Sequence, residues 1–232
     1  MRARKIVFLL LVIGVMFQVG LMFDIPLKNN IITRVVNEPN LVYQPIKEYV
    51  NVSDPGTSAI VLGVGVFNTS NNGLLGEVIR INITLRDGTG LDFVDVSSSN
   101  FETDFQVTLS QIRTYVERFT ASSLRNKDVL VTMDAGATTI GGQSASATMT
   151  VALIALVKRI NITEDAVFTG VLEPNGRVGE IGELKKKTQI AAQAGLSKII
   201  APKTQCDEAD RTQNIEIVCV ETIKQALEEM TA

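Results

Sequence analysis

The first hydrophobic run of the chain differs from the later ones because it is long and has no polar face. Residues 6–23 carry no charge and one polar side chain, Gln18, and Arg2, Arg4 and Lys5 precede them. At about 1.5 Å of rise per residue, this run approaches the roughly 30 Å hydrocarbon thickness of a bilayer. The pattern predicts a transmembrane helix at 6–23 after a short cytoplasmic terminus. Because positive charge favours the cytoplasmic side, we expect the rest of the chain to lie outside the cell membrane.

A cleaved signal peptide is the alternative interpretation of this run. The residues at its end, 21–25, read Leu-Met-Phe-Asp-Ile, which are bulky and do not resemble a small-x-small cleavage site. We therefore expect the helix to stay attached as a single-pass anchor. Residues 24–55 are rich in proline and mixed polar residues, which predicts a stalk or linker.

Residues 56–232 carry the periodic patterns of a folded domain. The first part has β-rich runs, then a helix with one apolar face, then a short apolar strand; these lie at 58–67, 78–85, 91–96, 105–119 and 128–133. The second part holds a helix from about 145 to 160, a hairpin within 165–182, a helix at 183–194 and a strand at 197–201. The predicted fold class is α+β, with mixed sheets, hairpins and packed helices after one transmembrane helix.

Composition excludes several classes of function. The net charge is −3, from 22 basic and 25 acidic residues, and no cluster of Lys and Arg supports nucleic-acid binding. The chain has no histidine and two cysteines, which do not suffice for a zinc site. No dinucleotide or Walker-type phosphate loop is present, so we expect no cofactor and no metal, and an energy-driven activity would need a separate ATPase.

Two sets of residues leave alternatives open. Four Asn-x-Ser/Thr triplets, at Asn51, Asn68, Asn82 and Asn161, agree with an exported domain but also arise by chance. The cysteines, Cys206 and Cys219, could form a disulfide outside the cytoplasm or remain two buried thiols inside it.

The candidate nucleophile is a serine between a glycine-containing loop and an apolar helix. Residues 134–146 read Asp-Ala-Gly-Ala-Thr-Thr-Ile-Gly-Gly-Gln-Ser-Ala-Ser, which places Ser144 where free backbone N–H groups can stabilise negative charge. Ser144 could instead cap the helix, and Ser146 is a competing nucleophile that local chemistry does not separate from it.

Without histidine, the base for such a serine must be another group. Three lysines begin the helix predicted at 183–194, and Lys185 follows Leu184 where a side chain can turn inward. Lys186 and Lys187 fit a solvated helix face. Lysine acts as a base only when burial brings its pKa down from about 10.4 towards neutrality.

The two segments together resemble the proteolytic domain of Lon proteases. Residues 136–153 are similar to the serine segment of that family, and 168–170 with 176–187 are similar to its lysine segment. Residues 194–203 continue the likeness, which covers about 56–232. The Ser-Ala-Ser pattern resembles the membrane-anchored archaeal branch, although here the predicted anchor is N-terminal and the chain has no ATPase domain.

The resemblance implies roles for individual residues. Ser144 falls on the nucleophile of the family, Lys185 on its general base, and Thr169 on the threonine that holds the lysine. Backbone N–H groups around Gly142 and Gln143 would hold the oxyanion. Gln143 and the two glycines before it stand where the family usually has an acidic residue or proline.

These observations predict a membrane-anchored, ATP-independent serine endopeptidase that hydrolyses peptide bonds in unfolded or flexible polypeptides. The family implies a homohexamer, and the sequence does not identify an ATPase partner. The alternative is a non-catalytic binding or scaffold module of Lon fold at the cell surface, against which the presence of both a serine and a lysine argues.

Overall fold

The computed structural model describes residues 32–34, 56–68, 74–95, 100–101, 103–135, 139–140 and 143–231. The predicted transmembrane helix at 6–23 and nearly all of the predicted stalk lie outside these residues. Among the residues that the structure does describe, no helix is both long enough and apolar enough to cross a membrane.

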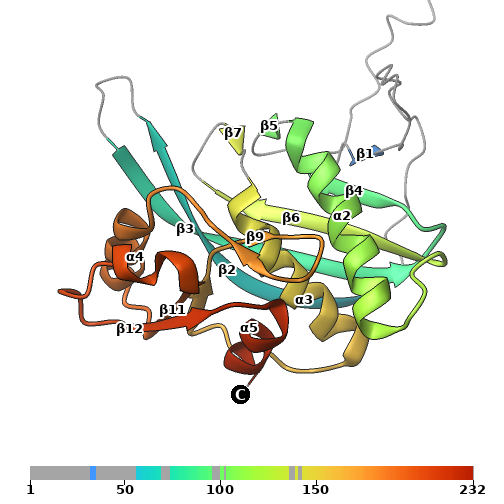
Figure 1. The fold of residues 1–232 in the computed structure, drawn as a ribbon. Helices are drawn as coiled ribbons and strands as arrows, with labels where there is room; N and C mark the ends of the chain where they lie inside the picture. Colours follow the sequence, from blue (N-terminus) through green and yellow to red (C-terminus); the bar gives the residue numbers. More distant parts are fainter. Residues whose placement is uncertain are drawn as a thin grey trace, which may run out of the picture. The chain divides into compact units, whose positions relative to one another are not determined.

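An eight-stranded mixed sheet forms the frame of the domain (Figure 1). Its strand order is β1-β4-β6-β3-β2-β8-β11-β12, with four parallel and three antiparallel neighbour pairs. The strands are β1 (Ile32–Arg34), β2 (Thr57–Asn68), β3 (Leu74–Asp87), β4 (Asp92–Asp95), β6 (Lys127–Asp134), β8 (Ala166–Phe168), β11 (Lys198–Pro202) and β12 (Glu216–Val220). Two further small sheets pair β5 (Asn100–Phe101) with β7 (Thr139–Ile140) and β9 (Val171–Leu172) with β10 (Val178–Gly179).

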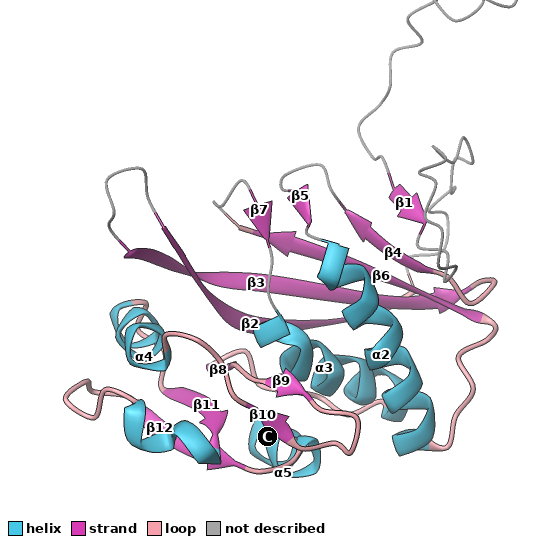
Figure 2. Cartoon of the chain, turned by 45° about the horizontal axis from the view of Figure 1, so that its top comes forward, coloured by secondary structure: helices cyan, strands magenta, loops and turns pink. Residues whose placement is uncertain are grey.

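Four α-helices pack on this frame. They are α2 (Thr103–Thr120), α3 (Ser146–Lys158), α4 (Leu184–Gln193) and α5 (Ile223–Met230), and two short 3-10 turns are η1 (Gln143–Ala145) and η2 (Lys203–Glu208). Helices α2 and α3 lie side by side along the long strands in both ribbon views (Figures 1 and 2). Their facing side chains are apolar at helical spacing, as with Leu109, Ile112 and Val116 on α2.

The sheet separates two hydrophobic cores because successive side chains of a strand point to opposite faces. On β8, Ala166 and Phe168 belong to the core under α2, α3 and α5, whereas Val167 belongs to the core under α4. On β11, Ile200 faces the first core and Ile199 faces the second. β8 and β11 therefore contribute side chains to both cores, the one on the α3 side of the sheet and the one on the α4 side.

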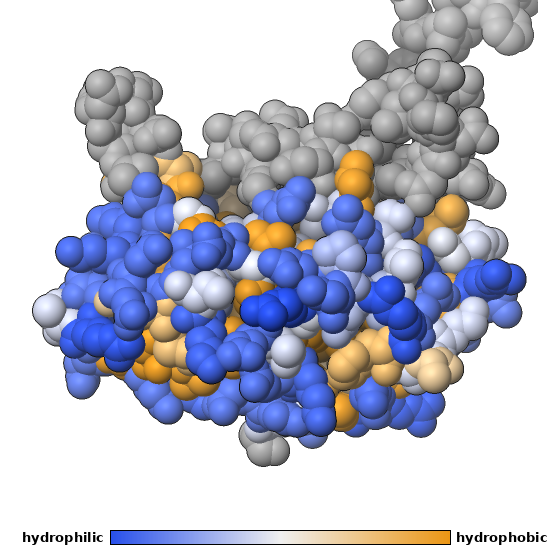
Figure 3. Space-filling view, in the orientation of Figure 1, coloured by the Kyte–Doolittle hydropathy of each residue, from blue (hydrophilic) through white to orange (hydrophobic). Residues whose placement is uncertain are grey.

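The surface over these helices is mostly hydrophilic (Figure 3). Among the described residues, the exposed large hydrophobic side chains are Leu75 on β3 and Val107 on α2. The apolar side chains of the described residues are thus largely buried in the two cores, as expected for a folded α+β domain.

The sequence-based element assignments agree well with the structure between residues 56 and 202. The predicted mixed sheet with packed helices is confirmed for the described part of the chain. The Asn175-Gly176 turn lies between β9 and β10, and Gly176 takes a φ of 83°, where a residue with a side chain would be strained. From residue 203 on, where the sequence pattern predicts no element, the structure places η2, β12 and α5.

Candidate active site

Ser144 lies in η1, directly before α3, and its backbone is fixed to the segment that follows β8. Its carbonyl oxygen accepts a hydrogen bond from the N–H of Gly170 at 2.9 Å. In return, the N–H of Ala147 donates to the Gly170 carbonyl at 3.1 Å. These two bonds hold the turn with the serine against residues 169–170, which lie 25 positions or so further along the chain.

Ser144 does not cap the helix. Helix α3 begins at Ser146, its N-cap residue is Ala145, and that cap makes no side-chain hydrogen bond. The interpretation of Ser144 as a cap is therefore wrong. Ser146, the competing nucleophile, is 2% exposed, and its hydroxyl oxygen accepts a hydrogen bond from the N–H of Leu172 at 2.7 Å. Ser146 thus fixes β9 to the start of α3.

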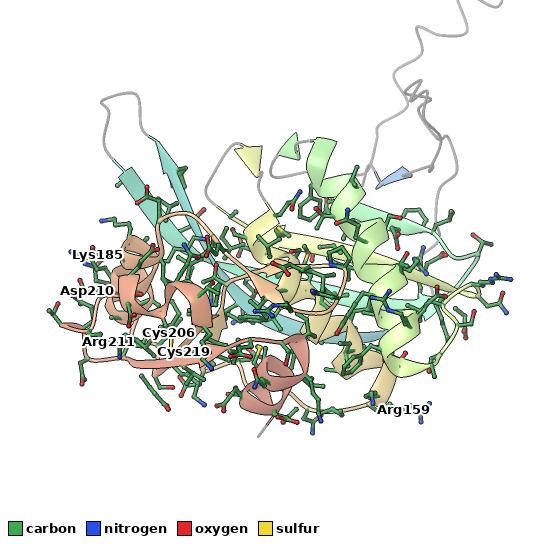
Figure 4. The ribbon with its side chains drawn as sticks, in the orientation of Figure 1. Arg159, Lys185, Cys206, Asp210, Arg211 and Cys219 are labelled. Atoms are coloured by element: carbon green, nitrogen blue, oxygen red, sulfur yellow. A yellow bond between two sulfur atoms is a disulfide. The ribbon has the colours of Figure 1, made fainter. Side chains whose placement is uncertain are left out.

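A lysine on the first turn of α4 reaches Ser144, and it is Lys187. Its Nζ lies 3.0 Å from the Ser144 Oγ and 3.0 Å from the Thr169 Oγ1, and the residue is 4% exposed. The expectation that Lys185 makes this contact is wrong: Lys185 is exposed and lies at the outer edge of the molecule (Figure 4). Each residue turns a helix by about 100°, so the residue three positions after the buried Leu184 shares its inward face, whereas the next residue does not.

Thr169 contacts the lysine, as expected, but its partner is Lys187. Thr169 follows β8 and is buried, and its N–H continues the parallel pairing by donating to the Ile200 carbonyl at 3.1 Å. Its hydroxyl accepts from the Lys187 Nζ and donates to the Ser144 carbonyl at 3.4 Å. One side chain therefore connects the lysine to the backbone of the serine.

Burial lowers the pKa of Lys187 from its ordinary value of 10.5 to about 8. The ammonium form loses much of its hydration at this site, which disfavours the charged state. At pH 7, about a tenth of the amine is then neutral and has a lone pair available for the hydroxyl proton of Ser144. A serine and a lysine in hydrogen-bond contact, with the lysine poised to accept a proton, is an arrangement suited to nucleophilic catalysis.

Gly142 and Gln143 are the other two residues expected at the site. Gly142 lies outside the described residues, and Gln143 is an exposed residue of η1. Within the described part of the chain, no group of three His, Cys, Asp or Glu side chains is placed to hold a metal ion.

The two cysteines form a disulfide. Cys206 on η2 is bonded to Cys219 on β12, with their Cα atoms 5.9 Å apart (Figure 4). Of the two alternatives left by the sequence, the structure takes the disulfide. The bond ties the turn after β11 to the last strand of the sheet.

Comparison with known proteins agrees with the geometry. The family described as Lon protease (S16) C-terminal proteolytic domain matches residues 60–232. A Lon protease of Phenylobacterium zucineum is 30% identical over 161 residues, which make up 66% of this chain and 20% of that protein. Lon protease 1 of Myxococcus xanthus is 32% identical over 131 residues, covering 55% of this chain and 16% of that protein.

An archaeal relative is similar to about the same degree. The archaeal Lon protease of Archaeoglobus fulgidus is 30% identical over 117 residues, which make up 49% of this chain and 19% of that protein. The chain thus spans about a fifth or less of the length of these relatives. The match to the proteolytic domain covers most of the chain, and the chain therefore belongs to the Lon protease family.

Proposed function

We propose that this protein is a serine endopeptidase in which Ser144 is the nucleophile and Lys187 the general base. The observation that carries the proposal is the 3.0 Å contact between the Ser144 Oγ and the Nζ of a lysine that is 4% exposed. Hydrogen-bond contact between nucleophile and base is the first geometric requirement for this chemistry. The lowered pKa of Lys187 meets the second requirement.

The proposed reaction moves one proton back and forth through Lys187. The neutral amine takes the hydroxyl proton of Ser144 as the Oγ attacks the peptide carbonyl carbon, and the resulting ammonium then gives a proton to the departing amine. The C–N bond breaks and an ester with Ser144 remains. Lys187 next takes a proton from water, the hydroxide attacks the ester carbonyl, and the proton returns to Ser144 as the acid product leaves.

Two groups assist in this proposal. Thr169 accepts a hydrogen bond from the Lys187 Nζ and donates one to the Ser144 carbonyl, and in this way fixes the spacing of the pair. The backbone N–H groups at 142–144 are the proposed donors to the oxyanion. That part rests on the sequence, since Gly142 lies outside the described residues.

The cellular setting is proposed on separate grounds. The apolar run at 6–23 supports a single-pass anchor, and the Cys206–Cys219 disulfide supports an oxidising compartment for the proteolytic domain, outside the cytoplasm. All groups of the hydrolytic step belong to this chain, so we propose that flexible or unfolded polypeptides are cleaved without ATP. A homohexamer is proposed from family membership.

A cleavage assay with an unfolded polypeptide, with and without ATP, tests the proposal. Ser144→Ala and Lys187→Ala should each lower kcat/KM by on the order of 10³-fold or more, because the two groups act as a unit. Lys185→Ala is the matched control and should retain wild-type activity. Equal residual cleavage in the wild type, Ser144→Ala and Lys187→Ala would instead favour a scaffold module that binds polypeptides without hydrolysing them.

A further inference from the structure

The turn after β11 contacts the chain just before the helix that carries Lys187. Gln205, in η2, is 8% exposed, and its side-chain amide bonds to both backbone groups of Ile181. The Ile181 N–H donates to the Gln205 Oε1 at 2.6 Å, and the Gln205 Nε2 donates to the Ile181 carbonyl at 2.9 Å. The glutamine therefore satisfies the backbone N–H and C=O groups of the buried Ile181, as a neighbouring strand would.

The start of α4 needs such support from outside. Its N-cap residue, Glu183, makes no side-chain cap bond and lies in the left-handed region with a φ of 60°. Both features weaken a helix start, because a backbone N–H group is left without its side-chain acceptor and a residue with a Cβ is strained at positive φ. Lys187 is on the first turn of this helix, so a displacement of its start would carry the Nζ away from Ser144.

A second contact from the same region holds the next turn of α4. The Gln189 Nε2 donates to the Asp210 Oδ2 at 2.7 Å, and Asp210 also accepts from the backbone N–H and hydroxyl of Thr212. Hydrogen bonds from Thr212 and Gln189 hold the pKa of Asp210 well below its usual range, so the carboxylate stays charged.

The turn itself is anchored to the sheet. Cys206, next to Gln205, is bonded to Cys219 on β12, and β12 pairs in parallel with β11. The bonds from Gln205 and Asp210 thus join α4 to a covalently fastened part of the domain, rather than to a free loop.

From these contacts we propose that Gln205 is a positioning residue, which acts through Ile181 to hold the start of α4 so that Lys187 stays in contact with Ser144. The inference rests on the proposed function, since it assigns Gln205 a part in that same reaction. Gln205 does not touch the reacting atoms. The disulfide serves the same arrangement by fixing η2.

The consequence is a specific kinetic signature. Burial is the cause of the lowered pKa of Lys187, so a looser helix start that admits water moves this pKa back towards 10.5. If the pKa rises by about one unit, the neutral fraction at pH 7.5 falls roughly eightfold. A residue that supported only overall stability would leave the pH profile of the folded enzyme unchanged.

The experiment compares pH profiles of kcat/KM for the full chain with Gln205→Met, which keeps most of the volume and removes both hydrogen bonds. Gln225→Met is the matched control, because the Gln225 side-chain amide likewise accepts hydrogen bonds from backbone N–H groups, those of Glu221 and Thr222, but at the start of α5 and not of α4. We expect the acid limb of Gln205→Met to shift upward by about one pH unit, with kcat/KM at pH 7.5 lowered about eightfold and the control profile unchanged. Gln205→Glu keeps an acceptor for the Ile181 N–H and replaces Gln205→Met if that variant does not fold.

Two outcomes separate the possible failures. Profiles of the folded Gln205 variants that match the control would overturn the positioning role, while loss of activity in Ser144→Ala and Lys187→Ala would leave the proposed function in place. Cleavage that persists in Ser144→Ala and Lys187→Ala would remove the proposed function, and the positioning role with it.

Discussion

Replacing the buried lysine should make the protein inactive and more stable at the same time. Lys187→Met removes the amine but keeps a flexible apolar chain of similar length. The folded-state pKa is about 8 and the ordinary value is 10.5, so burial of this group costs roughly 3 kcal/mol of the free energy of unfolding at pH 7. Removing the amine recovers this cost, but it also removes the hydrogen bonds from Lys187 to Ser144 and Thr169, which offsets about 1–2 kcal/mol of the recovered stability. We expect a net stabilisation of about 1–2 kcal/mol at pH 7.

The stability difference between Lys187→Met and the wild type should depend on pH. At pH 7 and below, the lysine is mostly protonated in both states, so nearly the full burial cost applies. Between pH 8 and 10.5 the unfolded state binds more protons than the folded state, so the stability of the wild type rises with pH. Above 10.5 the cost is gone. The advantage of Lys187→Met should therefore shrink by roughly 3 kcal/mol from pH 7 to pH 11 and change sign.

Urea unfolding followed by circular dichroism at a series of pH values measures this difference. Lys185→Met is the control, because Lys185 is exposed on the same helix turn and should change stability by no more than about 0.5 kcal/mol at any pH. The reasoning predicts that burial of the Lys187 ammonium group destabilises the wild type. It would be refuted by a Lys187→Met variant that is less stable than wild type at pH 7, or by a stability difference that does not vary with pH.

Three further substitutions test separate parts of the structure. Thr169→Val keeps the shape but removes the hydroxyl that holds the lysine, so kcat/KM in the cleavage assay should fall about 10- to 100-fold, while Thr169→Ser should retain most activity. Glu183→Gly should raise the free energy of unfolding by about 1 kcal/mol, because Glu183 has a φ of 60°; Glu183→Ala, which keeps a Cβ, should show no such gain. Gly170→Ala should lower stability by about 1–3 kcal/mol, because its Cβ would overlap the Val178 Cγ1. The Cβ of Gly182→Ala meets nothing within 4 Å, and an equal loss there would contradict the steric argument.

The lysine shows how far the sequence could lead. The segment was identified correctly, because a run of three lysines opens a helix after a glycine-rich hairpin. The choice among the three required the helical phase. Leu184, Lys187, Thr188 and Ala191 recur at spacings of three and four and are all buried. This helical period places Lys187 on the inner face, whereas the apolar residues alone, Leu184, Ile190 and Ala191, do not indicate that a charged side chain shares that face.

The serine and the threonine were located for different reasons. The family resemblance favours Ser144 over Ser146. The structure separates the two serines through contacts that no local pattern encodes: Lys187 Nζ contacts the Ser144 Oγ, whereas the Ser146 Oγ accepts a hydrogen bond from the Leu172 N–H. Thr169 was found on its segment, but its burial depends on the pairing of β8 with β11, which joins distant parts of the chain.

The last thirty residues were beyond sequence reasoning. Their strand and helix are short, and the disulfide between Cys206 and Cys219 depends on the parallel pairing of β11 with β12, which brings the two cysteines together. Cysteine count alone allowed a bonded or a free pair.

In the proposed mechanism, the pairing of β8 with β11 also governs when activity can arise during synthesis. Thr169 is fixed by a hydrogen bond to the Ile200 carbonyl, so the support of the lysine is complete only after β11 has left the ribosome and paired. Ser144 emerges 43 residues before Lys187 and has no base until then. Under the proposed mechanism, a growing chain therefore carries Ser144 out of the exit tunnel in an inert form. Nearby unfolded polypeptides, including other nascent copies, would then not be cleaved until β11 has paired.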